Sequence, residues 1–215
     1  MNRKEVFNRQ TEAVLFDFGG VIAEEGFREG LFAISSNTKL DPAEFFKIAS
    51  DAIYDTGYII GKASECSYWD VLRLRTGVSM SNLEMRLEIL RRFNLRPWML
   101  RIIDKLRQQG YFVALLSDQT NWLDELDATG HFSGRFDAVF NSYHLGKGKK
   151  DASIFTDVAS LLGVDPQSCL FVDDNPGNIS RASSVGYQTI LYKTPESFAE
   201  EFSLLRLIPG LDLVM

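Results

Sequence analysis

Three apolar runs of the chain each end in polar side chains that can bind a cation or a phosphate group. These side chains are Asp17, Ser117 and the neighbouring pair Asp173 and Asp174. If the runs are parallel strands, their carboxyl ends meet at the edge of the sheet where open α/β folds bind ligands. Carboxylates without a His or Cys partner are hard oxygen donors, which suit Mg²⁺ and leave room for water and a phosphate. The pattern therefore predicts a Mg²⁺ site built from Asp17, Asp173 and Asp174.

Each of these aspartates also has a structural interpretation, which the sequence leaves open. An aspartate after a strand can cap a helix or form a turn. Asp173 and Asp174 stand directly before residues 175–177, Asn-Pro-Gly, which are typical of a turn. The two interpretations are compatible, because one carboxylate can shape a turn and bind a cation.

A glycine-containing loop supplies three lysines, Lys147, Lys149 and Lys150. One lysine that reaches the carboxylates would balance their charge and that of a phosphate group. The alternative for each lysine is a solvated position on the surface, and we expect this for two of the three.

Apolar runs and helical patterns alternate along much of the chain. Five runs are short and apolar enough to be strands buried on both faces, namely residues 13–16, 111–116, 136–140, 169–172 and 188–192. Three segments between them have the apolar spacing of helices, namely residues 97–109, 151–162 and 178–185. This order predicts an α/β fold with a doubly wound, Rossmann-like parallel sheet.

The segment 22–95 interrupts this alternation. It contains no convincing buried strand, although a crossover between parallel strands needs only about a dozen residues. It has helical runs instead, at residues 43–53, 65–74 and 82–93, and Asp41 before Pro42 is a suitable N-cap. We therefore expect a helical cap domain, residues 22–95, inserted after the first strand of a core domain formed by residues 1–21 and 96–215.

The composition is that of an ordinary globular protein and argues against several classes. The chain has 215 residues, of which 45% are hydrophobic and 24% charged, and its formal net charge is −6. An acidic chain has no global basic field for nucleic acid or anionic membranes. The sequence also has no apolar run long enough to cross a bilayer. We expect no nucleic-acid partner and no membrane partner.

Cysteine usage and the two ends of the sequence bear on location and assembly. Cys66 and Cys169 have no metal-type spacing and fit a reducing compartment. Residues 1–12 are polar and lack the apolar segment of a secretory signal, so we expect a cytoplasmic protein. The apolar segment 204–215 can dock on its own domain or on a second copy, which leaves a homodimer open.

Four short motifs, in this order, resemble those of the haloacid dehalogenase superfamily, whose hydrolases use an aspartate as nucleophile. They are Phe-Asp-Phe-Gly-Gly-Val at 16–21, Leu-Leu-Ser-Asp at 115–118, Ser-Tyr-His-Leu-Gly at 142–146 with Lys149 beyond it, and Phe-Val-Asp-Asp-Asn-Pro-Gly-Asn-Ile at 171–179. The predicted helical insert resembles the cap domain of this family. Within the superfamily the chain looks most like the branch that contains bacterial sugar-1-phosphate phosphatases and the N-terminal domains of epoxide hydrolases.

The resemblance implies covalent phosphoryl transfer. Asp17 would attack phosphorus and form an aspartyl-phosphate, which splits one difficult displacement into two steps. Ser117 and the turn at Asp118 would hold phosphate oxygens, and Lys149 would stabilise Asp17 and the transferring phosphoryl group. The implied function is a Mg²⁺-dependent phosphomonoester hydrolase that acts on a small phosphorylated metabolite, with a sugar phosphate as the leading candidate.

The resemblance also implies the metal ligands. Asp17, the backbone carbonyl of Gly19, and Asp174 together with Asp173 would hold the Mg²⁺ ion. This ligand set contains the same three carboxylates that the strand ends predict.

The chain departs from the family pattern at three positions, one of which is Lys150, where the family often has a proline after the third-motif lysine. Gly19 stands where a second Asp commonly serves as general acid/base, a function worth about 10²–10⁴-fold in rate. Glu24 or Glu25 could replace it, and the alternative for both is a solvated position. Asp118 stands where the family usually has Asn, which places extra negative charge near the phosphate.

Two other functions are compatible with these departures. A catalytically weak member of the family would act as a binding or regulatory protein. A 2-haloacid dehalogenase also lacks the second Asp, but that branch works without a metal and does not keep an acidic pair like Asp173 and Asp174. Its first motif usually has Tyr where Gly19 stands.

Overall fold

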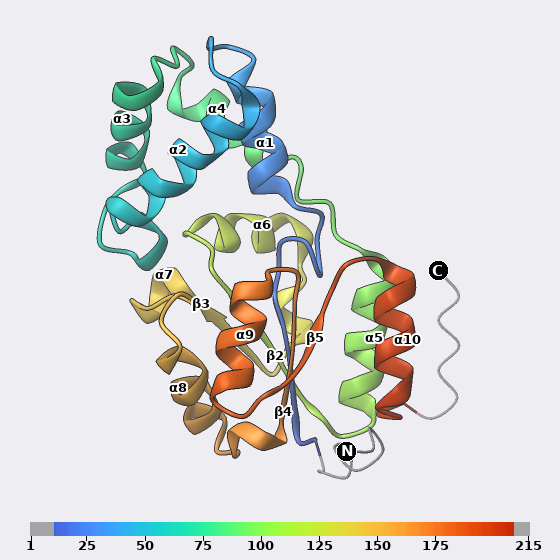
Figure 1. Ribbon diagram of the computed structural model, residues 1–215. Coiled ribbons are helices and arrows are strands. Elements are labelled where there is room, and N and C mark those ends of the chain that lie inside the picture. The colour runs from blue at the N-terminus through green and yellow to red at the C-terminus, as the bar shows by residue number, and fades with distance from the viewer. Residues whose placement is uncertain (1–10, 209–215) are drawn as a thin grey trace.

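Five short parallel strands form the central sheet of the computed structural model, which describes residues 11–208 (Figure 1). The strands are β1 (Ala13–Phe16), β2 (Phe112–Ser117), β3 (Ala138–Asn141), β4 (Cys169–Asp173) and β5 (Gln188–Leu191). Their order in the sheet is β3-β2-β1-β4-β5, and every neighbouring pair is parallel. The chain runs outward in one direction from β1 to β3 and in the other from β4 to β5. This confirms the doubly wound parallel sheet that the sequence predicts.

Burial on both faces explains why these strands are apolar at every position. In β1, Val14 and Phe16 pack into one apolar cluster, and Ala13 and Leu15 pack into another. The first cluster includes residues of α5 (Pro97–Gln108) and α10 (Pro195–Leu204), and the second includes residues of α8 (Ser153–Leu162) and α9 (Pro176–Ser184). Because side chains alternate between the faces of a strand, a sheet covered on both sides needs apolar residues throughout.

Four helices between β1 and β2 form the insert beyond the carboxyl edge of the sheet (Figure 1). They are α1 (Gly26–Ser35), α2 (Pro42–Asp55), α3 (Glu65–Thr76) and α4 (Asn82–Leu90). The Asp41 carboxylate accepts a hydrogen bond from the Ala43 N–H at 2.9 Å, which confirms the predicted N-cap of α2. The helical insert after the first strand is therefore present, and its division from the core at residues 22 and 95 stays a prediction.

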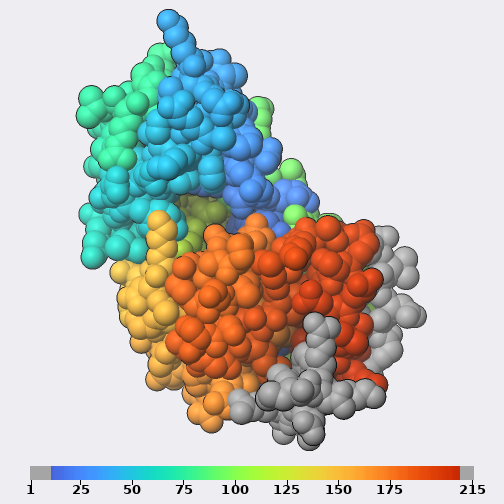
Figure 2. Space-filling view, in the orientation of Figure 1, coloured from blue at the N-terminus to red at the C-terminus, as the bar shows by residue number. Residues whose placement is uncertain are grey.

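Two connecting segments join the insert to the sheet, and they pair with each other. The Glu24 N–H donates to the Asn94 carbonyl at 2.9 Å, and the Arg96 N–H donates to the Ile22 carbonyl at 2.8 Å. Figure 2 shows the surface hollowed between the insert and the sheet region below it. A cavity between the two parts is lined by Asp17 and Ser117 at the strand ends and by Phe46 and Tyr54 of α2.

Helix α1 is missing from the helical runs predicted for the insert, and two glycines explain the weak signal. Glycine is among the poorest helix formers, so Gly26 and Gly30 suggest a loop. At Gly30 the packing requires glycine, because an added Cβ would lie 2.6 Å from the Cα of Ile89 in α4. The close approach of α1 and α4, rather than helix propensity, therefore explains the glycine at position 30. Helices α6 (Trp122–Gly130), α7 (Ser142–Leu145) and α10 are likewise absent from the predicted runs.

The expectations about location and assembly depend partly on residues that the structure does not describe. Leu207 and Ile208 pack into the apolar core, but residues 209–215 of the predicted docking segment lie outside the described residues. Residues 1–10, which bear on the expected absence of a signal, lie outside them as well. Within residues 11–208, no helix combines the length and apolarity that crossing a membrane requires.

Candidate active site

The carboxyl ends of β1 and β4 bring the predicted carboxylates together. Asp17 follows the last residue of β1, Asp173 ends β4, and Asp174 is the next residue. One carboxylate oxygen from each of the three lies within 4.8 Å of the other two. Ser117, at the end of β2, lines the same cavity as Asp17 and Asp174. The site lies where the strand order reverses, as the parallel-sheet argument predicts.

Lys149 lies buried between two of these carboxylates. Its Nζ is 2.7 Å from Asp17 Oδ2 and 2.7 Å from Asp173 Oδ2, and its side chain is 1% exposed. Burial alone would lower the pKa of Lys149, but the carboxylates of Asp17, Asp173 and Asp118 raise it above its ordinary value. The lysine is therefore charged, and it links the end of β1 to the end of β4.

The other two lysines of the loop do not reach the carboxylates. Lys147 pairs with Asp157 and donates to Ser153 Oγ at 2.8 Å. Lys150 is exposed, and its Nζ lies 3.2 Å from the centroid of the Tyr54 ring. Of the three lysines that the sequence leaves as candidates, Lys149 alone contacts the carboxylates, while Lys150 lines the outer part of the same cavity beside Tyr54.

Asp173 is fully buried and anchors a hydrogen-bond network under the site. Its Oδ1 accepts from the Asn175 N–H at 2.7 Å, and the Asn178 amide donates to both carboxylate oxygens at 3.2 and 3.0 Å. Arg181 completes the network, because its Nε donates to the Lys149 carbonyl and its Nη2 to Asn178 Oδ1, both at 2.6 Å. The first turns of α9 thus fix Lys149 in place.

Asn178 and Arg181 were not among the predicted site residues. Asn178 belongs to the fourth motif, and Arg181 follows it by three residues. Residues at this spacing share one face of a helix. The sequence did offer a signal for both residues. An Asn and an Arg at this spacing follow directly after an acidic pair and the start of a helix, and this indicates that both lie near the carboxylates.

Asp17 and Asp174 face the cavity and carry the charge that a cation would neutralise. Burial raises the pKa of Asp17 well above its usual range, and Asp173 and Asp174 add to this effect while Lys149 opposes it. Burial and the neighbouring Asp173 also raise the pKa of Asp174. Three carboxylates around one lysine leave an excess of negative charge among oxygen donors. The residues present therefore fit a hard divalent cation.

Gly20 leaves the space that Asp174 occupies. Its φ is +79°, a left-handed conformation that side chains rarely adopt, and an added Cβ would collide with the Asp174 carboxylate. Gly19 lines the cavity beside it, and its carbonyl stays a predicted metal ligand. The paired glycines of the first motif are thus explained at Gly20 by backbone conformation and close approach.

Asp118 has a different environment from the one expected of a phosphate ligand. Its Oδ1 accepts from the Lys149 backbone N–H at 2.8 Å, and its Oδ2 accepts from the Tyr54 hydroxyl at 3.4 Å. Burial raises the pKa of this carboxyl. A carboxylate can only accept hydrogen bonds, so the side chain positions the loop of Lys149, and contact with phosphate stays predicted for the backbone of this turn.

The structure places Glu24 and Glu25, the two candidates to replace the second Asp of the family pattern, in different environments. The Arg96 guanidinium holds Glu24 through hydrogen bonds of 3.0 and 2.8 Å, and Glu24 does not line the cavity. Glu25 does line it, and an ideal Cβ built on Gly19 would lie 3.1 Å from Glu25 Oε2. The Glu25 carboxyl therefore occupies the space into which a side chain at position 19 would extend.

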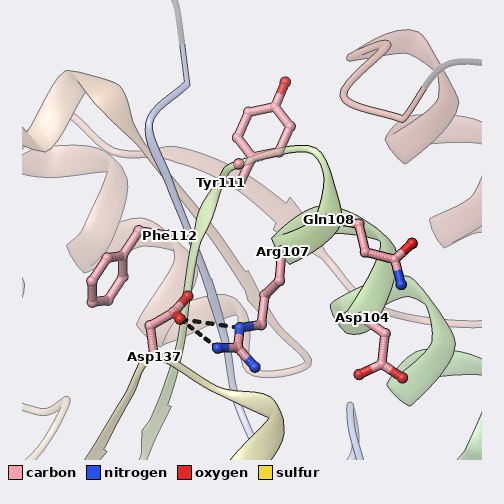
Figure 3. Close-up of a pocket in the computed structure, with 7 residues that line it drawn as sticks. Asp104, Arg107, Gln108, Tyr111, Phe112 and Asp137 are labelled. Atoms are coloured by element: carbon pink, nitrogen blue, oxygen red, sulfur yellow. Dashed lines mark hydrogen bonds and ion pairs between the residues drawn. The ribbon is translucent and has the colours of Figure 1, made fainter.

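A second pocket lies at the opposite, amino-terminal edge of the sheet (Figure 3). Arg107 donates to Asp137 Oδ1 at 3.0 and 2.8 Å, and Asp104 pairs with Arg135. The charged groups that line this pocket are thus already paired within the protein. It lacks the converging carboxylates and buried lysine of the cavity at the carboxyl edge.

A parallel α/β sheet with this carboxylate–lysine centre defines an enzyme class, the hydrolases that carry an aspartate at the end of the first strand. The model of the haloacid dehalogenase-like hydrolase family matches residues 11–186, and the chain belongs to this family. The resemblance inferred from the four motifs is confirmed.

Two curated relatives and one solved structure illustrate the similarity. Flavin mononucleotide hydrolase 1 of Arabidopsis thaliana is 25% identical over 105 residues, which cover 49% of this chain and 43% of that protein. Enolase-phosphatase E1 of Persephonella marina is 36% identical over 70 residues, which cover 33% and 28%. The matches thus span less than half the length of these relatives. A family enzyme from Bacteroides thetaiotaomicron, solved with magnesium and inorganic phosphate, superposes with a TM-score of 0.69 at 23% identity and covers 89% of this chain and 99% of its own.

Proposed function

We propose that this hydrolase releases phosphate from a small phosphomonoester through an aspartyl-phosphate formed on Asp17, with Mg²⁺ as cofactor. The observation that carries the proposal is the buried, charged Lys149 between Asp17 and Asp173, beside the open carboxylate of Asp174. Relatives named as phosphatases and as a flavin mononucleotide hydrolase support phosphorus chemistry. The similar structure with magnesium and phosphate supports the cofactor.

The Asp17 carboxylate is held for attack by two donors. The Phe18 N–H donates to Oδ1 at 2.7 Å, and Lys149 Nζ contacts Oδ2 at 2.7 Å. In the first step a carboxylate oxygen of Asp17 bonds to phosphorus, the bond from phosphorus to the ester oxygen breaks, and that oxygen takes up a proton. In the second step water attacks phosphorus, the aspartyl bond breaks, and inorganic phosphate leaves. Ser117 and the N–H groups of its turn would hold phosphate oxygens.

Asp17, Asp174 and the Gly19 carbonyl would hold the metal, since these residues line the cavity. Bound Mg²⁺ would offset the negative charge of the phosphoryl oxygens and of the attacking carboxylate. Asp173 also belongs to the carboxylate cluster, but hydrogen bonds from Asn175, Asn178 and Lys149 already occupy both of its oxygens. We assign Asp173 the role of holding Lys149.

The test is phosphate release from p-nitrophenyl phosphate with and without a chelator. We expect turnover with Mg²⁺, a loss of at least about tenfold with excess EDTA, and recovery when Mg²⁺ is restored. Chloride release from 2-chloropropionate without phosphate release would instead indicate a dehalogenase. Absence of turnover with every phosphomonoester at saturating Mg²⁺ would indicate the binding or regulatory alternative.

We further propose that Glu25 provides the proton transfers that a second Asp would otherwise perform. Its carboxyl lies beside Gly19 in the cavity, whereas Glu24 is held outside by Arg96. Glu25 Oε1 also accepts from the Arg28 N–H at 3.2 Å, so the start of α1 fixes the side chain. Glu25 alone would perform these proton transfers, without a second carboxylate from the insert.

Glu25→Gln should lower kcat by about 10²–10⁴-fold for an alkyl phosphate, because its leaving oxygen must be protonated as it departs. The loss should be smaller when the first step is measured with p-nitrophenyl phosphate, whose leaving group needs little protonation. Single-turnover kinetics on the two substrates give this comparison. Glu24→Gln is the matched control and should stay within about twofold of the parent. Equal losses in both variants would contradict the assignment.

A further inference from the structure

The wall of the cavity carries polar and cationic side chains besides the carboxylates and Lys149. They are those of Gln119, Lys150, Asn175, Asn178 and Arg181. The proposed reaction places one cationic side chain, that of Lys149, against the attacking carboxylate of Asp17. Lys150 and Arg181 add two further positive charges to the lining, and the chemistry at phosphorus does not account for the charge of either.

Lys150 reaches from a loop of the core to helix α2 of the insert. Its Nζ lies 3.2 Å from the centroid of the Tyr54 ring, and both residues line the cavity. The ring attracts the ammonium group and fixes its position, because the face of an aromatic ring is electronegative. An ammonium group has three N–H donors, and within residues 11–208 this one forms no hydrogen bond. The group is therefore held at the cavity with donors to offer a ligand.

Neither Lys150 nor Arg181 has a carboxylate partner in the part of the chain that the structure describes. Lys149, by contrast, contacts two carboxylates. The Arg181 guanidinium donates to the Lys149 carbonyl and to Asn178 Oδ1, both at 2.6 Å, and these bonds use only part of its N–H donors. The Lys149 carbonyl belongs to the peptide group that joins it to Lys150, so the guanidinium lies next to the backbone from which the Lys150 side chain starts.

Two carboxylates near Lys150 have other partners. Asp118 accepts from the backbone N–H of Lys149 at 2.8 Å. Asp51, which is exposed on α2, is held by Lys47 at 2.8 Å. The hydrogen bond from Lys47 lowers the pKa of the Asp51 carboxyl, and the charge of Lys150 adds a smaller effect. Neither carboxylate forms an ion pair with Lys150, so the charge of this lysine is available to an anion that enters the cavity.

The size of the cavity allows a second acidic group in the same small molecule. Its volume is about 360 Å³, whereas a cavity of about 150 Å³ is enough for benzene. A phosphate group at Asp17 and Lys149 therefore leaves room for a short chain and a further polar group. An anion that leaves water needs charged or hydrogen-bonding partners, and hydrogen bonds between charged groups are the strongest of these. Lys150 and Arg181 supply such partners on the cavity wall.

We propose that Lys150 determines specificity by binding a second anionic group of the substrate, either a carboxylate or a second phosphate. The inference rests on the proposed function, because it places the ester phosphate at Asp17 and Lys149. Lys150 donates to the second anion, and Arg181 adds positive charge beside it. The substrate class is therefore a phosphorylated acid or a bisphosphate, with both acidic groups in one small molecule.

The experiment compares kcat/KM for phosphorylated hydroxy acids with kcat/KM for their primary amides. The acids have chains of two, three and four carbons with the phosphate on the terminal hydroxyl, and each amide keeps the shape of its acid without the charge. We expect the acid whose chain reaches Lys150 to exceed its amide about tenfold, as one hydrogen bond between charged groups would give. The same chains ending in a phosphonate show whether a phosphate-like group is preferred to a carboxylate. Equal values for acid, phosphonate and amide at every chain length would overturn the proposal.

Variants test whether Lys150 is the source of this preference. Lys150→Met can still pack on the Tyr54 ring but has no charge, and it should bring the ratio of acid to amide close to one. Lys150→Glu should invert the ratio, because it places a like charge beside the second anion. Lys147→Met is the control in the same loop, since Lys147 pairs with Asp157 and does not line the cavity, and it should keep the parent ratio. A parent-like ratio in Lys150→Met, or an equal loss in Lys147→Met, would overturn the role of Lys150.

A binding measurement keeps this inference distinguishable from the proposed function. In phosphonate analogues of the same acids and amides a CH₂ group replaces the ester oxygen, so they cannot be hydrolysed. Calorimetry with these analogues in the presence of Mg²⁺ reports affinity whether or not the protein turns over any phosphate ester. Tighter binding of the acid that depends on Lys150, without turnover of any ester, would refute the proposed hydrolysis and support the second anion site. Turnover with equal affinities for acid and amide would support the hydrolysis and refute the second anion site.

Discussion

We expect Asp17→Asn to fold like the parent protein and to lose at least about 10⁴-fold of the proposed phosphatase activity, comparable with the loss of a nucleophile in other covalent hydrolases. A carboxamide is a much poorer nucleophile than a carboxylate, and it removes one of the charges that attract the metal. That loss corresponds to about 5.4 kcal/mol of transition-state stabilisation. Phosphate release under single-turnover conditions measures it.

The fold should tolerate this substitution. Burial and two neighbouring carboxylates raise the pKa of Asp17, so its ionised form costs free energy in the metal-free protein. The amide removes that cost but can accept only one of the two hydrogen bonds, from Phe18 N–H and Lys149, that the carboxylate accepts. We expect the two effects to offset each other to within about 1 kcal/mol in the free energy of unfolding.

Asp70→Asn is a matched control, because this aspartate is exposed on α3 and its side chain is 77% accessible. It should keep the parent rate. Acid quenching followed by mass spectrometry should find a phosphoryl group on Asp17 in the parent and none in Asp17→Asn. Retention of most of the parent rate by Asp17→Asn would refute the covalent mechanism, and a phosphoryl group on another residue would relocate the nucleophile.

The strands and the carboxylate cluster could be predicted because their determinants are local. A run buried on both faces is apolar at every position, as in β1 and β4, and the aspartate that ends such a run is visible in the sequence. Parallel strands then bring Asp17 and Asp173 to one edge whatever their separation along the chain. No knowledge of side-chain packing is needed for this step.

The choice between Lys147, Lys149 and Lys150 depends on contacts that are distant in sequence. The Asp118 carboxylate holds the Lys149 N–H, and Arg181 holds its carbonyl. These contacts turn one lysine inward and leave its neighbours at the surface. Local composition is the same for all three, so the sequence alone could not distinguish them.

The apolar residues that line the cavity were not predicted for a related reason. Phe46 and Trp122 lie on helices from opposite sides of the insert boundary, and they line one cavity only because of how the insert sits above the sheet. The position of Glu25 depends likewise on where α1 begins, and that helix was missed. Sequence patterns therefore could not predict the positions of side chains that are set by the packing between insert and sheet.

We expect Lys149→Met to lower the free energy of unfolding by about 3–5 kcal/mol at pH 8, which urea denaturation with a chelator present would measure. Methionine fills much of the space of the lysine stem but leaves both Asp17 and Asp173 without their cation. Removing one partner of a buried ion pair costs far more than the pair contributes, because the remaining charge is not solvated. Lys147→Met is the matched control in the same loop. Its partner is exposed, so we expect a loss much smaller than that of Lys149→Met.

The loss caused by Lys149→Met should shrink as the pH falls. Lys149 opposes the rise in the pKa of Asp17 that burial causes, so removing the lysine raises this pKa further above its value in the unfolded chain. A carboxyl group with a raised pKa in the folded state destabilises the protein only at pH values where it is ionised. Acidification from pH 8 to pH 5 should favour the protonated form of Asp17 and reduce its share of the penalty, whereas the effect of Lys147→Met should show no such trend. A loss that is equal at both pH values, or no larger than that of Lys147→Met, would show that Lys149 is not the counter-ion of the buried carboxylates.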